Sequence, residues 1–379
     1  MDTARHPLSP RLDHCPEGLP REAYVSPDWF AHEVRAVFGR EWICAGRLDQ
    51  QEPGTMRRRR LGEAEVVLCR ASDGAVSAFH NTCRHRGAEL CRAAVEPLGK
   101  LIRCRYHAWS YAAADGRLVS TARAVPTADF DPSAHGLLPV AVRVWNGFVF
   151  LNAAPNPGPL QADIPLTALD SWPMADLVSG HRFDAVIACN WKVFWENYSE
   201  CLHCPGIHPE LCDRVPVYAE GIMAANEASG WTPDQRAAPA LTPGAQSWTP
   251  SGQPCGPVFP GLTPAERQAG HTFVTLWPSL FVVAHVDHVR AVRLEPLGPE
   301  ETRLSAEWYF ARETLAQPGF DAAAIAGFAT LVMQQDADAC EMNQRGLRSP
   351  AFTAARLMPE EYEIHRFHHW VRTHLEDCP

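Results

Sequence analysis

Cys83-Arg84-His85 and, eighteen residues later, Cys104-Arg105-Tyr106-His107 form the stretch that decides the fold of the first half of this chain. Each half of the stretch offers one thiolate and one imidazole. Two thiolates and two imidazoles at such spacing are typical of a metal-binding site. The pattern therefore predicts two loops, here called arms, that approach one metal centre.

Two kinds of centre use this ligand set. A [2Fe–2S] cluster of the Rieske type takes two cysteines on one iron and two histidines on the other. A structural zinc ion also accepts two cysteines and two histidines. Zinc sites mostly pair their cysteines as Cys-x2-Cys, whereas here each arm carries one cysteine and one histidine. The interleaving favours the iron–sulfur cluster.

The residues around the arms predict a small all-β domain over residues 41–154. Short runs rich in β-branched and aromatic residues alternate with turn signals such as Asp115-Gly116 and Asn146-Gly147. Residues 1–40 are expected to form an N-terminal helical arm, with a capped helix after Ser26-Pro27. The proline-rich run at residues 155–159 reads as a linker.

Residues 155–379 predict a second domain of mixed character. Helices are expected at residues 190–203, 322–345 and 359–375, and strands at residues 272–297 and 302–311. Between them, residues 205–270 are rich in proline and glycine, and a loop of that length is functional or mobile. These elements favour an α+β domain, a sheet with helices on one side.

The expected helix at residues 190–203 and the residues that follow it carry a second set of candidate metal ligands. Glu196, Glu200 and His203 are spaced to share one helical face. Pro205-Gly206 is expected to break the helix, so that His203 and His208 meet one ion. Two imidazoles and one carboxylate form the facial triad of non-haem Fe(II) oxygenases.

The carboxylate of this second set is not decided by spacing. Asp336 and Asp338 of the late helix both qualify, and Glu200 is the nearest acid in sequence. A zinc site made by Cys201, His203 and Cys204 is an alternative.

Composition excludes several classes of function. The 379 residues are 46% hydrophobic with a formal net charge of −10, which argues against a nucleic-acid partner. No run of about 18 apolar residues occurs, so no membrane span is expected. Residues 1–20 lack the apolar core of a secretory signal. We expect a cytoplasmic protein whose thirteen cysteines are reduced thiols or metal ligands.

With both motifs in view, the chain resembles the α subunit of a Rieske non-haem iron oxygenase. The resemblance implies an all-β Rieske domain followed by a helix-grip (START-like) catalytic domain with an antiparallel sheet. It implies that the [2Fe–2S] cluster is bound by Cys83, His85, Cys104 and His107. It also implies that the mononuclear Fe(II) is bound by His203, His208 and Asp336. Asp338 is then a minor alternative.

The stretch from Glu196 to Leu211 looks like the subgroup of glycine betaine, carnitine and stachydrine oxygenases. Most of the family has an aspartate three residues before the first iron histidine, where this chain has Glu200. The resemblance implies N-demethylation of a quaternary ammonium substrate, with formaldehyde release. Aromatic ring hydroxylation or O-demethylation is the alternative. Residues that offer aromatic rings to such a cation include Phe194, Tyr198, Trp277, Phe281 and Trp308.

The resemblance also implies partners. Electrons would come from NAD(P)H through a separate flavin-containing reductase of the ferredoxin-reductase type, and the subunit would form a homotrimer. Glu200 would connect His107 of one subunit to an iron histidine of its neighbour. The chain departs from the family in two places, with Arg105 where proline is usual and Ala108 where glycine is usual.

Overall fold

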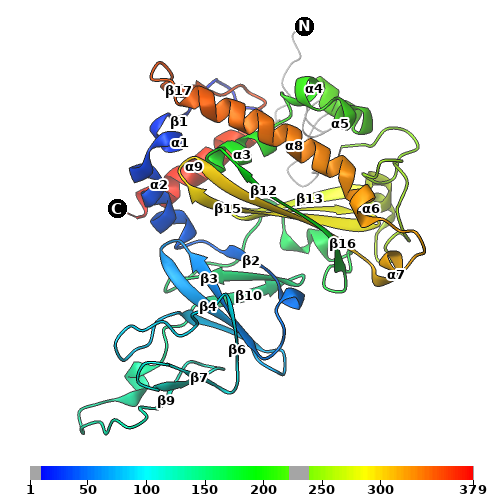
Figure 1. The fold of residues 1–379 in the computed structure, drawn as a ribbon. Helices are drawn as coiled ribbons and strands as arrows, with labels where there is room; N and C mark the ends of the chain where they lie inside the picture. The colour runs from blue at the N-terminus through cyan, green and yellow to red at the C-terminus, as the bar shows by residue number, and fades with distance from the viewer. Residues whose placement is uncertain (1–9, 222–238, 379) are drawn as a thin grey trace. The chain divides into compact units, whose positions relative to one another are not determined.

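The computed structural model describes residues 10–221 and 239–378. Contacts divide these residues into a β unit, residues 33–160, and a helix–sheet unit, residues 161–377 together with the described residues up to His32 (Figure 1). We expected residues 1–40 to form an N-terminal helical arm. The described part of this segment also contains β1 (Glu17–Pro20), which pairs antiparallel with β17 (Ala354–Arg356) of the helix–sheet unit.

The β unit consists of three antiparallel sheets, with strand orders β10-β11-β2, β5-β4-β3-β6 and β7-β8-β9. Their bounds are β2 Ile43–Arg47, β3 Thr55–Leu61, β4 Ala64–Arg70, β5 Val76–His80, β6 Val95–Pro97, β7 Leu101–Arg103, β8 Ser110–Ala112, β9 Leu118–Ser120, β10 Ala141–Trp145 and β11 Phe148–Asn152. The expected all-β character is confirmed.

Strand β4 separates two hydrophobic cores. Val66 and Leu68 face one core, which also contains Val149 of β11. Val67 and Cys69 face the other, which contains the cysteines of the two arms. Because alternate residues of a strand point to opposite faces, this run is buried on both sides.

The predicted turn at Asn146-Gly147 is a two-residue hairpin loop between β10 and β11. Trp145 pairs with Phe148 across it, and both loop residues have positive φ values, 50° and 80°. Asparagine followed by glycine tolerates this backbone best, so the sequence determines the hairpin locally.

The helix–sheet unit is built on an antiparallel sheet with the order β12-β16-β15-β14-β13. Its strands are β12 Val178–Ile187, β13 His271–Leu276, β14 Leu280–His285, β15 His288–Gly298 and β16 Glu301–Phe310. Its helices are α1 Glu22–Val25, α2 Pro27–Glu33, α3 Trp191–Tyr198, α4 Cys204–Ile207, α5 Pro209–Arg214, α6 Pro264–Ala269, α7 Arg312–Leu315, α8 Ala322–Leu347 and α9 Tyr362–Glu376.

The long helix α8 runs across one face of this sheet beside α3 (Figure 1). The Asp321 side chain accepts hydrogen bonds from the amides of Ala323 and Ala324 and so begins α8. The Asn190 side chain begins α3 in the same way. The expected α+β class, with an antiparallel sheet and helices on it, is confirmed.

The helix expected at residues 190–203 is shorter than predicted. It ends at Tyr198, and Pro205 lies in the first turn of the next helix, α4, where its missing N–H costs nothing. Glu196 therefore does not share a helical face with Glu200 and His203. It accepts a hydrogen bond from the Tyr24 hydroxyl at 2.7 Å.

The proline- and glycine-rich stretch at residues 205–270 contains α4, α5, α6 and a 3-10 turn at Pro216–Glu220. Part of it, residues 222–238, lies outside the described residues. Among the helices that the structure describes, none is long and apolar enough to span a membrane.

Candidate metal centres

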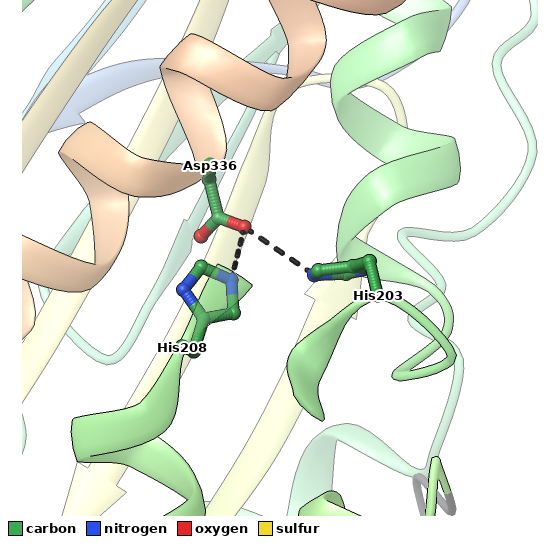
Figure 2. A group of neighbouring side chains, drawn as sticks. All are labelled: His203, His208 and Asp336. Carbon is green, nitrogen blue, oxygen red and sulfur yellow. Dashed lines mark hydrogen bonds and ion pairs between the residues drawn. The ribbon is translucent and has the colours of Figure 1, made fainter. Parts of the chain in front are cut away.

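Three side chains from separate segments of the helix–sheet unit meet at one point (Figure 2). His203 precedes α4, His208 lies between α4 and α5, and Asp336 lies in α8. Their ligand atoms lie within 4.8 Å of one another. Oδ1 of Asp336 is 2.9 Å from Nε2 of His208 and 3.6 Å from Nε2 of His203.

The local sequence explains how the two histidines converge. Pro205 and Pro209 each lie in the first turn of a short helix. Between the two helices His208 has a non-helical backbone, with φ −123° and ψ 63°, so the chain changes direction there. The two imidazole centroids consequently lie 5.1 Å apart.

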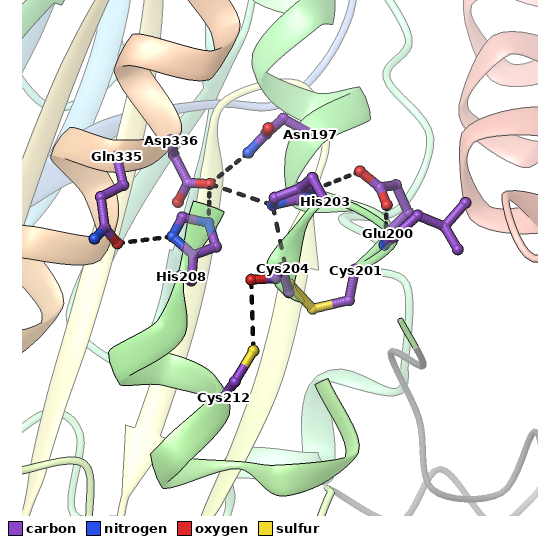
Figure 3. The surroundings of a disulfide bond; sticks show 10 residues. Asn197, Glu200, Cys201, His203, Cys204, His208, Cys212, Gln335 and Asp336 are labelled. Carbon is purple, nitrogen blue, oxygen red and sulfur yellow. Dashed lines mark hydrogen bonds and ion pairs between the residues drawn. A yellow bond between two sulfur atoms is a disulfide. The ribbon is translucent and has the colours of Figure 1, made fainter. Parts of the chain in front are cut away.

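The other nitrogen of each imidazole is held by a hydrogen bond (Figure 3). Nδ1 of His203 lies 2.5 Å from Oε1 of Glu200, and Nδ1 of His208 lies 2.8 Å from Oε1 of Gln335. Both bonds place the ring proton on Nδ1 and leave Nε2 to face Asp336. Metal-binding histidines are oriented in this manner.

Two further hydrogen bonds hold the side chains of Asp336 and Gln335 in position. Asn197 donates to Oδ1 of Asp336 at 2.6 Å. Gln335 donates its amide to Glu210 at 3.1 Å, which turns the Gln335 oxygen toward His208. These contacts leave little freedom for the three converging groups.

Electrostatics also fit a cation at this point. Burial lowers the pKa of His203, but hydrogen bonds with Asp336 and Glu200 outweigh it and raise the pKa to about 9. Burial raises the pKa of Asp336, but hydrogen bonds with His203 and His208 lower it to about 2. An ionised carboxylate and two imidazole Nε2 atoms directed at one point form a donor set that Fe(II) accepts, so the residues fit a mononuclear iron.

The alternatives left by the sequence occupy different environments in the structure. Asp336 belongs to the group, whereas Asp338 is exposed on α8. Glu200 contacts the back of His203 and lies outside the converging set. A disulfide joins Cys201 to Cys204 (Figure 3), which removes both sulfurs from a zinc site. The expectation that all cysteines are reduced is wrong at this pair.

The two arms of the β unit have matching backbones. The amide of Gly87 donates to the carbonyl of Cys83 at 2.9 Å, and the amide of Ala108 donates to the carbonyl of Cys104 at 3.0 Å. Each turn closes with a residue in the left-handed region, Gly87 at φ 75° and Ala108 at φ 60°. The first arm has glycine there, while Ala108 adopts the same backbone at a steric cost.

The side chains of the arms divide by environment. Cys83 and Cys104 are buried, whereas His85 is exposed and His107 is partly exposed, with their rings 4.6 Å apart. The Tyr111 hydroxyl accepts from the Arg84 amide, so its own proton can bond to the Cys83 sulfur 3.1 Å away. Two buried cysteine sulfurs and two more exposed imidazoles fit a [2Fe–2S] cluster of the Rieske type.

Arg105, which replaces the usual proline, has its own partner. It donates to Oε2 of Glu96 at 2.8 Å, while Oε1 of Glu96 accepts from the amides of Arg92 and Ala93. Burial raises the pKa of Glu96, but the amide hydrogen bonds and Arg105 more than offset it and lower the pKa. The ion pair therefore ties the second arm to β6.

A second converging group contains Cys255, Asp287 and His288. The Asp287 carboxylate already accepts hydrogen bonds from the Ser247 hydroxyl and the Cys255 amide, and lies 3.0 Å from Nδ1 of His288. These bonds satisfy the carboxylate and join a loop to the β14–β15 hairpin.

Three of the five aromatic candidates lie within one cluster of rings, and we call them the aromatic wall: Phe194, Tyr198 and Phe281. The rings of Tyr198 and Phe281 stack at 4.1 Å, and Phe194 lies 6.2 Å from Phe281. Trp277 packs on Phe367 instead. Trp308 lies edge-on to a histidine of β12 at 5.4 Å.

Sequence reasoning missed Asn197, Gln335, Tyr111 and the buried Arg290. Gln335 directly precedes Asp336, but only the fold shows that it contacts His208. Nothing in the local pattern distinguishes the other three.

Comparisons with known proteins agree with both centres. Residues 174–377 match the family described as ring hydroxylating alpha subunit (catalytic domain), and residues 41–131 match the Rieske [2Fe-2S] domain. The glycine betaine monooxygenase oxygenase subunit of Chromohalobacter salexigens is 31% identical over 364 residues, which cover 88% of this chain and 80% of that protein. The carnitine monooxygenase oxygenase subunit of Acinetobacter pittii is 29% identical over 378 residues, 94% of each chain.

A solved structure of a quaternary ammonium Rieske monooxygenase superposes with a TM-score of 0.70. It covers 95% of this chain and 96% of that chain at 22% sequence identity. A similarity at this identity supports a shared fold.

Proposed function

This chain belongs to the ring-hydroxylating α subunits of Rieske oxygenases, and from that premise we propose that it hydroxylates an N-methyl group of a quaternary ammonium substrate. It is a Rieske-type oxygenase component that uses a [2Fe–2S] cluster and a mononuclear iron. Its fold, an all-β Rieske domain and an antiparallel catalytic domain, agrees with the expectation from sequence.

The proposed reaction consumes the substrate, O2, an electron pair and two protons. One oxygen atom enters a C–H bond of the N-methyl group, and the other leaves as water. The N-hydroxymethyl product then loses its hydroxyl proton, and its C–N bond breaks with the electron pair on nitrogen. The products are formaldehyde and a tertiary amine.

Two sets of residues divide the work. We assign the cluster to Cys83, His85, Cys104 and His107, and the mononuclear iron to His203, His208 and Asp336. Bound iron supplies the activation of O2. Glu200 and Gln335 hold the two imidazoles so that both Nε2 atoms stay directed at Asp336.

We assign Glu200 a coupling role. Its carboxylate accepts from His203 and from the Leu202 amide, and it retains lone pairs for another donor. We propose that this donor is His107 of a neighbouring copy in a trimer, because His107 is partly exposed on its own unit. A separate reductase with flavin would deliver electrons from NAD(P)H.

The aromatic wall supports the substrate class. Faces of tyrosine and phenylalanine attract quaternary ammonium groups. Phe194 and Tyr198 of the aromatic wall lie on helix α3, which also carries Asn197. Because Asn197 donates a hydrogen bond to Asp336, the aromatic wall lies beside the proposed iron ligands.

The converging His203, His208 and Asp336 carry this proposal, and formaldehyde release tests it. Iron-loaded protein with a reductase and NADH is supplied with glycine betaine, L-carnitine and choline in turn. We expect O2-dependent formaldehyde from at least one compound, and none from the Asp336→Ala variant. Silence with all three, alongside O2 uptake with an aromatic acid, would favour ring hydroxylation or O-demethylation.

A further inference from the structure

Arg290 of β15 is a buried arginine whose charge is not paired by any residue that the structure describes. Its side chain is 5% exposed, and its Nε atom is buried with no hydrogen-bond partner among residues 10–221 and 239–378. Within those same residues, the guanidinium forms no ion pair or side-chain hydrogen bond, and it lies over the ring of Phe281. A buried, unpaired charge is unfavourable, so proteins seldom retain one without a ligand or a function.

Strand register places Arg290 on the face of the aromatic wall. Arg290 pairs with Val283 of β14, and Phe281 pairs with Val292. Side chains two residues apart on a strand share a face, so Arg290 and Phe281 point to the same side of the sheet. The guanidinium carbon lies 6.0 Å from the centroid of the Phe281 ring, on which Tyr198 stacks.

The same face leads to the proposed iron ligands. Tyr198 ends α3, and its neighbour Asn197 donates to Asp336. Burial lowers the pKa of Arg290, and the electrostatic interactions with Tyr198 and Asp336 partly compensate. The Arg290 guanidinium thus lies beside the aromatic wall, on the side of the sheet that leads to Asp336.

Resting on the proposed function, we propose that Arg290 binds the carboxylate of the substrate, which is therefore a zwitterionic ammonium carboxylate. A guanidinium accepts a carboxylate through two parallel hydrogen bonds, a stronger and more directional pairing than a neutral group offers. The carboxylate would neutralise Arg290, while the ammonium group lies along the ring of Tyr198. The two ends of such a substrate would then direct an N-methyl group toward His203, His208 and Asp336. An ammonium alcohol lacks the anion and would leave Arg290 unpaired.

Methyl esters of the same compounds test what the substrate carboxylate contributes to binding, because they lack its negative charge. Glycine betaine and L-carnitine are each compared with their methyl esters, and with choline, by formaldehyde release from the iron-loaded protein with its reductase. We expect KM to be roughly 100-fold lower for the carboxylates than for their esters. In Arg290→Gln the KM of the carboxylates should rise to that of the esters, whereas the KM of the esters and their kcat should change little.

Arg293 provides the matched control. It lies on the same strand, on the opposite face, and is partly exposed. Arg293→Gln removes the same charge and should keep the preference for carboxylates. Arg290→Lys should keep part of the preference, because ammonium retains the charge but not the paired geometry.

Folding is checked in the same preparations. The absorption spectrum of the cluster and the iron content should match those of the parent protein. Thermal denaturation of ligand-free Arg290→Gln should occur at the same temperature or higher, since an unpaired buried charge is removed.

The outcomes separate the two proposals. If the esters and choline are used as well as the carboxylates, and Arg290→Gln affects all of them equally, the role of Arg290 is wrong and the proposed function stands. If no quaternary ammonium compound yields formaldehyde, both proposals fail.

Discussion

The two metal centres of this chain are encoded in different ways. The proposed ligands of the cluster lie in two short arms, each closed by its own backbone hydrogen bond, from Gly87 to Cys83 and from Ala108 to Cys104. The proposed iron ligands depend on the packing of α8 against distant segments, since His208 and Asp336 are 128 residues apart. A locally encoded site should tolerate changes elsewhere, whereas a site assembled by tertiary packing should be lost when one contributor is removed.

The largest expected effect separates the two centres outright. His208→Ala should abolish binding of mononuclear iron and lower turnover by more than about 1,000-fold, because a ligand is lost. The absorption spectrum of the cluster should stay unchanged. His369→Ala, at an exposed position of α9, is the control and should retain full activity. Loss of the cluster spectrum in His208→Ala would show that the centres are not independent.

Glu200→Ala should reduce turnover by about 10- to 100-fold while both metals remain bound, because the variant loses the hydrogen bond that orients His203. Iron analysis together with steady-state kinetics measures both quantities. If iron content falls to zero while the cluster persists, Glu200 is a ligand and the coupling role is wrong.

Gln335→Leu should weaken iron affinity by roughly 10-fold, because Nδ1 of His208 loses its acceptor. Titration of the metal-free site with Fe(II) under anaerobic conditions gives the affinity. Gln334→Leu changes the exposed neighbour on α8 and should have no effect. Equal losses in both variants would indicate a general effect on the helix.

The cluster arm should depend on pH through Glu96. The folded protein lowers the pKa of Glu96 below its ordinary 4.5. The ionised form therefore stabilises the fold above pH 4.5, and that stabilisation is lost as the pH falls through the lowered value. Visible circular dichroism of the cluster should report this loss, and Glu96→Gln should remove it. Glu89→Gln, at an exposed position, should behave like the parent protein.

The smallest effect concerns the second arm. Ala108→Gly should raise the free energy of unfolding of the β unit by about 0.5–1 kcal/mol, because glycine adopts a positive φ without steric cost. Gly87→Ala should lower it by a similar amount. Denaturant midpoints followed by cluster absorbance measure both. If both variants changed the free energy of unfolding in the same direction, the two arms would not have matching backbone geometry.

This contrast also explains what could be predicted from the sequence. The strands, the Asn146-Gly147 hairpin and the Cys83–His107 stretch depend on neighbouring residues, and the structure agrees with them. The end of α3 at Tyr198 was missed, because a proline that can break a helix can equally begin the next one.

Other features required the fold. Asp336 and Asp338 are chemically identical in sequence, and only the rotation of α8 distinguishes them. Arg290 is one arginine among many until the sheet register buries it beside Phe281. Burial and convergence are properties of packing, so local patterns do not carry them.

Quantification of iron and acid-labile sulfide after anaerobic loading with Fe(II) tests the presence of two separate centres most directly. The account predicts about three iron atoms and about two sulfides per chain, falling to about two of each in His208→Ala. A parent protein that binds about two iron atoms and about two sulfides, with no further iron at any Fe(II) concentration, would contradict it.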